Sequence, residues 1–227
     1  MNPSTLSEFL EALGTSHRTR QSRQGLSRIT LMLKRLGLAV QPHCPMITVG
    51  GTNGKGSTVA ALQSLAVHHG YRVGAFTSPH VCQFNERIAI QRVPASDAEI
   101  FEAFQKISAA QGDLELSYFD YSFLAARSLF EATPLDLIVW EVGIGGREDA
   151  VNVMSSQVSV VTSIAWDHMD ILGDSLELIA FQKAGIFRHN CPAIFPNHLP
   201  QALEDEDRKS TRLNSSHSDR SRMPSSA

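Results

Sequence analysis

A glycine-rich segment between residues 50 and 57 carries the residue types needed to hold a phosphate group. It reads Gly-Gly-Thr-Asn-Gly-Lys-Gly-Ser, follows the apolar run 46–49 and leads into a segment with helical spacing. Glycines let backbone amides approach phosphate oxygens, a helix N-terminus attracts anions, and Lys55 can neutralise a terminal phosphate. The alternative is a glycine-rich turn without a ligand. We predict a nucleotide-binding loop formed by Thr52, Asn53, Gly54, Lys55, Gly56 and Ser57.

Three further polar residues follow apolar runs that have the character of strands. Ser78 comes after the run 71–76, Glu141 closes the run 137–140, and His168 follows the run 157–164. An acid at the end of an apolar strand is costly to bury without a partner, and a metal ion is a natural partner. We therefore interpret Glu141 as a candidate magnesium ligand. Taken alone, Glu141 could be a satisfied strand-end carboxylate, and turn and core roles would suit Ser78 and His168.

The elements that would position these residues alternate between strands and helices. The predicted strands are 46–49, 71–76, 135–140, 157–164 and 192–195; the predicted helices are 6–13, 26–36, 57–69, 96–110, 118–131 and 175–183. Apolar strands separated by amphipathic helices are typical of a parallel sheet covered on both faces. We predict an α/β fold of this kind. Its ligands should lie beyond the carboxyl ends of the strands.

Composition and charge exclude several classes of protein. The chain has 227 residues, 42% of them hydrophobic, and a formal net charge of −3. No apolar run approaches the roughly 18 residues of a membrane span, and the first residues lack the order of a signal peptide. We expect a cytoplasmic protein that binds neither membrane nor nucleic acid. Residues 1–207 are predicted to form the domain, and the serine-rich stretch 208–227 a disordered tail that resembles translated vector sequence.

Five segments together resemble the Mur-ligase superfamily and, within it, the folylpolyglutamate synthase and dihydrofolate synthase family. They are, in order, Gly51–Ser57, Thr77–Ile88, Glu141–Asn152, Asp167–Gly173 and Lys183–Phe187. The resemblance implies a Mur-ligase-type ATP-binding domain with a phosphate loop. It also implies that Lys55 helps to hold ATP, that Ser78, Glu141 and His168 ligate magnesium, and that Lys183 is carbamylated.

The same resemblance implies a reaction and its substrates. The reaction is the ATP-dependent addition of L-glutamate to dihydropteroate or folates through an acyl phosphate, with Lys55, Glu141, His168 and Lys183 as catalytic residues. Contacts with the pterin substrate are implied for Ser16, His17, Tyr118, Phe119, Asp120, Asp149, Ala150 and Asn152. Val151 stands where the family has threonine, so one hydroxyl of that contact is lost.

Chain length separates the remaining alternatives. Members of this family are about twice as long and carry a C-terminal α/β domain, so we expect a monomeric N-terminal fragment without ligase activity of its own. A cell-wall Mur ligase would need a UDP-binding domain, and the 49 residues before Gly50 are too few for one. A nucleotide-binding module without catalytic activity is the other alternative.

Overall fold

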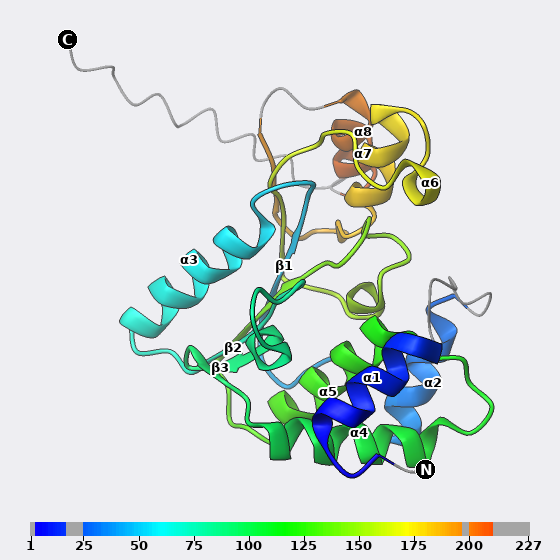
Figure 1. Cartoon of the computed structure of the whole chain (residues 1–227). Coiled ribbons are helices and arrows are strands. Elements are labelled where there is room, and N and C mark those ends of the chain that lie inside the picture. The colour runs from blue at the N-terminus through cyan, green and yellow to red at the C-terminus, as the bar shows by residue number, and fades with distance from the viewer. Residues whose placement is uncertain (1–2, 17–24, 197–199, 211–227) are drawn as a thin grey trace.

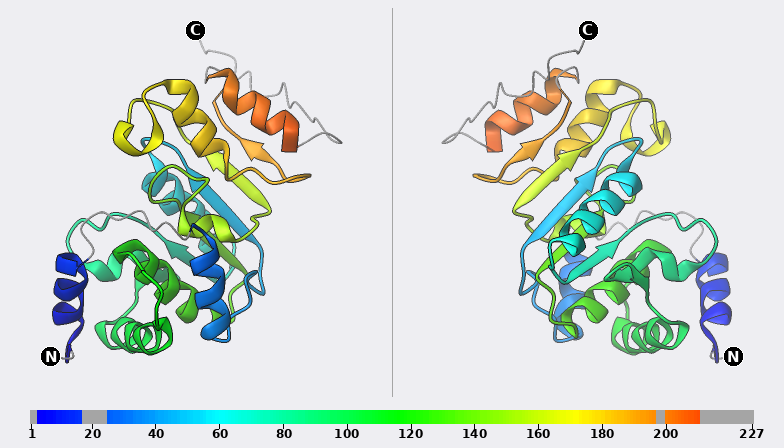
Figure 2. Two further views of the ribbon diagram at one scale, coloured as in Figure 1. Left: turned by 90° about the vertical axis from the view of Figure 1, so that its right-hand side faces the viewer. Right: turned by 90° about the vertical axis from the view of Figure 1, so that its left-hand side faces the viewer.

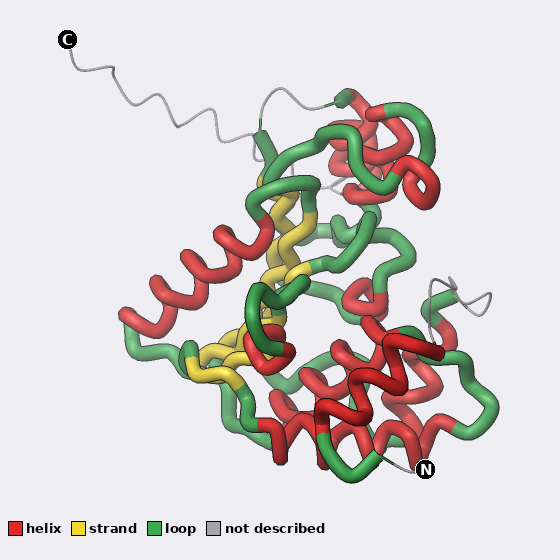
Figure 3. Tube along the Cα trace, viewed as in Figure 1, coloured by secondary structure: helices red, strands yellow, loops and turns green. Residues whose placement is uncertain are grey.

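The computed structural model describes residues 3–16, 25–196 and 200–210. Within these ranges the chain forms one seven-stranded sheet in the order β4-β3-β2-β5-β1-β6-β7, with helices on both faces (Figures 1 and 3). The strands are β1 (Met46–Gly50), β2 (Val73–Phe76), β3 (Ile88–Ile90), β4 (Val93–Pro94), β5 (Leu137–Glu141), β6 (Val158–Val161) and β7 (Ala193–Ile194). The α-helices are α1 (Leu6–Ser16), α2 (Ser27–Arg35), α3 (Lys55–His68), α4 (Asp97–Gln111), α5 (Tyr118–Glu131), α6 (Met169–Leu172), α7 (Leu176–Ala184) and α8 (Gln201–Ser210).

The predicted strands and helices are all present, with ends that differ by a few residues. Strands β2, β5, β1, β6 and β7 run parallel, which confirms the predicted α/β class. Helix α1 extends beyond the predicted range 6–13, through Gly14, to Ser16. Gly14 does not adopt a positive φ angle, so nothing in its backbone stops the helix.

The sheet is mixed, because two short strands that were not predicted, β3 and β4, add an antiparallel edge to the parallel strands. Strand β3 pairs antiparallel with β2, and β4 pairs antiparallel with β3. The turn between them places Gln91 at φ 52° and Arg92 at φ 66°. Such hairpin turns usually carry Asn or Gly at these positions, so the sequence gives no turn signal here. Pro94 is tolerated because β4 lies at the sheet edge.

Alternate side chains of the central strands face opposite helical layers. On one face, Val49 and Val139 pack with Val59 of α3. On the other face, Trp140 packs its ring 5.6 Å from that of Phe76 and 5.3 Å from that of Phe123 of α5. Figure 1 shows α3 alone on one side of the sheet, with α1, α2, α4 and α5 together on the other.

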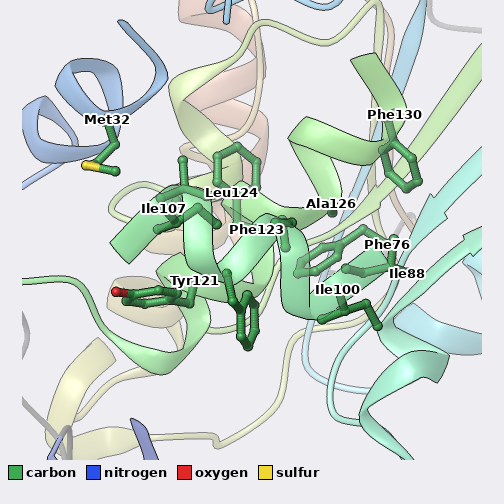
Figure 4. Packing of buried hydrophobic residues seen from close by; sticks show 14 of the residues in the cluster. Met32, Phe76, Ile88, Ile100, Ile107, Tyr121, Phe123, Leu124, Ala126 and Phe130 are labelled. Atoms are coloured by element: carbon green, nitrogen blue, oxygen red, sulfur yellow. The ribbon is translucent and has the colours of Figure 1, made fainter. Parts of the chain in front are cut away.

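The larger core lies between the sheet and these four helices. Figure 4 shows Phe123 and Leu124 of α5 packed among side chains of neighbouring elements, including Met32 of α2 and Ile107 of α4. All four of these side chains are fully buried. This core fixes α5 against β5, and the residues that begin α5 are therefore held close to the end of the sheet.

A smaller core joins α7 and α8 to the β6 side of the sheet. Ala180 and Ala184 of α7 pack with Leu203 of α8 and Val161 of β6. Figure 2 shows the two helices beside each other at the end of the sheet that carries β7. The predicted domain boundary at residue 207 falls inside α8, and the division of the chain there stays a prediction.

No helix in the described part of the chain combines the length and the apolar character that a membrane crossing requires.

The start of α5 is held by a reciprocal cap that can be tested. Ser117 Oγ accepts a hydrogen bond from the Asp120 amide at 3.1 Å, and the Ser117 amide donates to Asp120 Oδ2 at 2.8 Å. We expect Ser117→Ala to lower the free energy of unfolding by about 1 kcal/mol, measured by urea denaturation. Ser117→Thr should retain most of the parent stability, and equal losses in both variants would contradict a capping role.

Candidate active site

The glycine-rich loop joins β1 to α3 and opens onto a cavity of about 590 Å³. Gly54 precedes α3 with a φ angle of 83°, a left-handed conformation that suits glycine. The helix begins at Lys55, so its first backbone amides lie at the cavity. All six residues predicted to bind nucleotide, from Thr52 to Ser57, line this cavity. The structure therefore forms the predicted arrangement of strand, glycine-rich loop and helix, and nucleotide binding by these residues stays a prediction.

The chain that follows β6 holds the loop in shape. The Thr52 amide donates to Ser163 O at 2.8 Å, and the Asn53 amide donates to Ser163 Oγ at 2.9 Å. Thr162 Oγ1 donates to Asn53 O at 2.6 Å. Gly51 makes this close approach possible, because a Cβ atom there would lie 2.1 Å from Thr162 Oγ1.

The Lys55 side chain curls over its own loop. Its Nζ donates to Gly51 O at 3.0 Å and to Thr52 O at 3.2 Å, and the residue is half-buried. These carbonyls are neutral, and no carboxylate of the described residues lies within ion-pair distance of the ammonium group. Lys55 is therefore a cation held beside the helix N-terminus at the wall of the cavity, which favours an anionic ligand there.

Glu141 and Ser78 meet across the ends of β5 and β2. Only 3% of Glu141 is exposed, and its Oε2 accepts a hydrogen bond from the Ser78 amide at 3.2 Å. Burial raises the pKa of the Glu141 carboxyl, opposed by this hydrogen bond and by the charges of Lys55 and Arg87. Among the described residues, no Lys, Arg or His nitrogen lies within ion-pair distance of it.

The donor set at this point fits a hard divalent cation. The Glu141 carboxylate and the Ser78 hydroxyl are oxygen donors, the type that magnesium prefers, and both residues line the cavity. A bound cation would also balance the buried carboxylate charge.

The third predicted metal ligand, His168, lies apart from this pair. It precedes α6 with a φ angle of 41°, its side chain is 47% exposed, and it is not among the residues lining the cavity. Its Nε2 lies 3.5 Å from Asp167 Oδ1, which leaves Nδ1 for another partner. Over residues 3–16, 25–196 and 200–210, no group of three His, Cys, Asp or Glu side chains could hold a metal ion. Metal binding by Ser78, Glu141 and His168 together stays a prediction.

Lys183 links the glycine-rich loop to the chain after β6. It is 1% exposed, and its Nζ donates to Gly51 O at 3.1 Å and to Asp167 Oδ2 at 3.2 Å. Burial lowers the pKa of the Lys183 ammonium, and the nearby Asp167 carboxylate opposes that shift. These contacts are those of an amine donor, and carbamylation of Lys183 stays a prediction.

Three of the residues predicted to contact the pterin begin α5. Two of them, Tyr118 and Phe119, are half-buried there. Asp120 is buried, and its carboxylate accepts hydrogen bonds from Arg28 Nε at 3.0 Å and Arg28 Nη2 at 2.9 Å. This ion pair was not predicted, since 92 residues separate its partners. Five further residues were predicted to contact the pterin; of these, Ser16 ends α1, and His17 lies outside the described residues.

The Asp149 carboxylate shapes the loop that follows β5. It accepts hydrogen bonds from the amides of Gly143 at 3.0 Å, Ile144 at 3.2 Å and Val151 at 3.0 Å. Burial raises the pKa of Asp149 to about 7, although these donors oppose the shift. The Phe119 ring lies against the same loop. It is so close to Gly143 that a Cβ atom there would be only 2.7 Å from the ring.

Two neighbours of Asp149 were also predicted to contact substrate. Ala150 is buried in the short 3₁₀ helix Ala150–Val153. The Asn152 side-chain amide donates to Arg147 O at 3.0 Å and Gly185 O at 3.1 Å, and its Oδ1 accepts from Arg188. Asn152 therefore holds the backbone together, and a substrate contact would require it to exchange these partners.

Four residues at or beside the cavity were given no role by the sequence: Gln63, His80, Glu86 and Arg87. The first three line the cavity, and Arg87 bonds His80. The segment Thr77–Ile88 contains the last three, and its composition of His, Glu and Arg beside Ser78 was the available signal.

The close approach at Gly51 predicts a steric requirement. Gly51 has a φ angle of 132°, which L side chains rarely adopt, so we expect Gly51→Ala to lower the free energy of unfolding by more than about 1 kcal/mol. In Gly14→Ala, the new Cβ would meet nothing within 4 Å, and helix propensity should leave stability equal or higher. Thermal or urea denaturation compares the two, and equal stability of Gly51→Ala and the parent would contradict the assigned contact.

The buried Asp149 carboxyl predicts a pH dependence of stability. Its pKa is about 7 in the folded protein, against roughly 3.9 in an unfolded chain. The folded state then binds the proton more tightly, so the free energy of unfolding should fall as the pH rises from about 4 to about 7. Asp149→Asn removes this titration while every other group stays the same. The difference in stability between parent and variant should change across that range, and a constant difference would contradict the raised pKa.

No family model matched the chain. Its sequence is 44% identical over 208 residues to dihydrofolate synthase/folylpolyglutamate synthase of Haemophilus influenzae, covering 91% of this chain and 47% of that protein.

Two solved structures are similar to the chain. Escherichia coli FolC in complex with DHPP and ADP has a TM-score of 0.85 and 40% identity, over 91% of this chain and 50% of that one. The bifunctional folylpolyglutamate synthase/dihydrofolate synthase of Yersinia pestis, complexed with AMPPNP and Mn, has a TM-score of 0.85 and 38% identity, over 92% and 52%. The chain thus spans about half the length of the relatives it matches. Across the matched residues, in sequence and in fold, the chain is similar to the dihydrofolate synthase/folylpolyglutamate synthases.

Proposed function

We propose that the whole protein is an ATP-dependent ligase that joins L-glutamate to the carboxylate of dihydropteroate or of folates. The observation that carries this proposal is the cavity in which the N-terminus of α3 and Lys55 face the buried Glu141. An anion site beside a buried carboxylate suits a nucleoside triphosphate bound with a divalent cation. The relatives support it, since they carry ADP or AMPPNP with Mn and bear this activity in their names.

The glycine-rich loop would bind the phosphates of ATP. Backbone amides from Gly54 to Ser57 lie at the start of α3, where their N–H groups have no partner within the helix. Lys55 would exchange its contacts with the Gly51 and Thr52 carbonyls for a terminal phosphate oxygen. These groups would stabilise the negative charge that spreads over the phosphoryl oxygens during transfer.

Glu141 and Ser78 would hold the magnesium ion that accompanies ATP, with His168 as the further predicted ligand. When bound, the ion supplies positive charge to the phosphoryl oxygens and orients the leaving group. Glu141 is suited to this role because, among the described residues, its carboxylate accepts a hydrogen bond from the Ser78 amide but has no ion-pair partner. Lys55 and Arg87 act on it only through their charges.

The proposed reaction has two steps. A carboxylate oxygen of the pterin substrate attacks the γ-phosphorus, the bond to the bridging oxygen breaks, and ADP leaves with the electron pair. The amine of L-glutamate then attacks the carbonyl carbon of the acyl phosphate. A C–N bond forms, phosphate leaves with the C–O electron pair, and the amine gives its proton to water.

The loop that Asp149 shapes and the Phe119 ring beside it are proposed to contact the pterin, together with Tyr118.

Lys183 is proposed to act as a carbamate near the metal site. A carbamate nitrogen keeps a single N–H, so it could donate to only one of the two acceptors that Lys183 now contacts, Gly51 O and Asp167. Carbamylation would therefore be accompanied by the loss of one of these two contacts.

The nucleotide site predicts a large effect of Lys55→Ala. A hydrogen bond to a charged group is worth about 1.5–3 kcal/mol, so the Kd for ATP with magnesium should rise about 10- to 100-fold. Lys106→Ala is the matched control, because Lys106 is exposed on α4 and contacts Glu102 on the same helix. Isothermal titration calorimetry measures both, and an unchanged Kd for Lys55→Ala would contradict the site.

The ligase activity itself is tested by ADP formation in the whole protein. Turnover should require both L-glutamate and a dihydropteroate or folate, and Lys55→Ala should abolish it. ADP formation that ignores these two substrates would contradict the proposed function.

A further inference from the structure

One imidazole in the cavity has no role in the proposed mechanism. His80 lines the same cavity as Lys55, Ser78 and Glu141, on the segment that follows β2. Its environment determines which ring nitrogen carries the proton, and hence what it can offer to a ligand.

Arg87 fixes the tautomer of His80. Arg87 Nε donates a hydrogen bond to His80 Nδ1 at 2.9 Å, and a guanidinium group is always a donor. Nδ1 must therefore be the acceptor nitrogen, and the proton of the neutral ring lies on Nε2. Arg87 is itself held in place, because it is 8% exposed and its guanidinium carbon lies 5.5 Å from the ring centre of Phe84 and 5.3 Å from that of Tyr118.

In the part of the chain that the structure describes, no hydrogen bond engages Nε2, so this N–H remains available to a ligand.

The segment carrying His80 is fixed by its own carboxylate. Glu86 accepts hydrogen bonds from the amides of Val81 at 2.7 Å, Cys82 at 2.8 Å and Gln83 at 2.7 Å. These bonds lower the pKa of Glu86 and occupy its oxygens. Glu86 therefore holds the segment in shape and has little capacity left to compete with a ligand for the His80 donor.

Strand order places His80 on the far side of Glu141 from the phosphates. Strand β5, which ends in Glu141, lies between β1, which leads to the phosphate loop, and β2, which leads to His80. With the phosphates at the glycine-rich loop, as proposed above, a ligand group reached by His80 would lie on the other side of Glu141, where the attacking carboxylate could approach. Such a carboxylate is anionic and accepts hydrogen bonds.

We propose that His80 contacts the substrate of the ligase, its Nε2–H donating a hydrogen bond to an oxygen of the carboxylate that ATP activates. Arg87 is a positioning residue that acts through His80 by fixing this tautomer. The inference rests on the proposed function and adds a specific contact to it.

Two substitutions at His80 distinguish the effect of the Nε2–H donor from the effect of the aromatic ring. His80→Phe keeps an aromatic ring without the N–H, whereas His80→Gln returns an N–H donor at a similar distance from the backbone. In calorimetry with ADP and magnesium present, the Kd for dihydropteroate should rise about 10-fold in His80→Phe and stay near the parent value in His80→Gln. The Kd for ADP should not change in either. His69→Phe is the control, because His69 is exposed and follows the far end of α3.

The tautomer can be read directly by ¹⁵N NMR of the histidine side chains. The parent should show His80 protonated at Nε2, and Arg87→Met should add the Nδ1-protonated form. Two results would overturn the proposed role of His80 and leave the proposed function intact. One is a parent ring protonated at Nδ1; the other is a His80→Phe variant that binds dihydropteroate as tightly as the parent while ADP binds normally. Failure of the parent to bind ADP with magnesium would overturn the proposed function and this inference with it.

Discussion

The buried charge of Glu141 is the constraint around which the site is arranged. A carboxylate at the end of a central strand must be balanced, because an unpaired charge is costly away from water. The sheet register places Val49 of β1 beside Glu141, and Phe76 of β2 beside Trp140. The glycine-rich loop and Ser78 therefore meet the carboxylate from its two sides. They supply one amide hydrogen bond and the nearby charge of Lys55. Among the described residues the carboxylate has no ion-pair partner, so a bound cation could balance its charge.

A second set of contacts holds the loop at the correct distance from that carboxylate. Thr162 and Ser163 bind the loop backbone from the end of β6, and Lys183 binds Gly51 O from α7. Lys183 also contacts Asp167, so the loop and the chain carrying His168 are joined through one buried amine. Segments that lie far apart in the sequence therefore meet at the glycine-rich loop, each through a few hydrogen bonds.

Sequence alone predicted the parallel core strands, six of the α-helices and the glycine-rich loop between β1 and α3, because apolar periodicity, helix caps and glycine spacing are local signals. It did not predict α6 or α8. It did not predict the hairpin at Gln91 and Arg92, whose left-handed angles are unusual for these residue types. The resemblance implied substrate contacts for Asp120 and Asn152, which stay predictions. The sequence carried no signal for the partners that the structure gives them, Arg28 for Asp120 and backbone carbonyls for Asn152. Such partners depend on how distant segments pack, and local patterns carry no information about them.

The dependence of ATP binding on magnesium tests most directly whether the buried carboxylate is built for a metal-bound nucleotide. In the parent chain, magnesium should strengthen ATP binding, and in Glu141→Gln this gain should be lost while binding without magnesium is retained. The exposed Glu102 of α4 provides the control Glu102→Gln, which should behave as the parent. The account predicts a magnesium effect that requires the Glu141 charge. An equal effect of magnesium on the parent and on Glu141→Gln would contradict it.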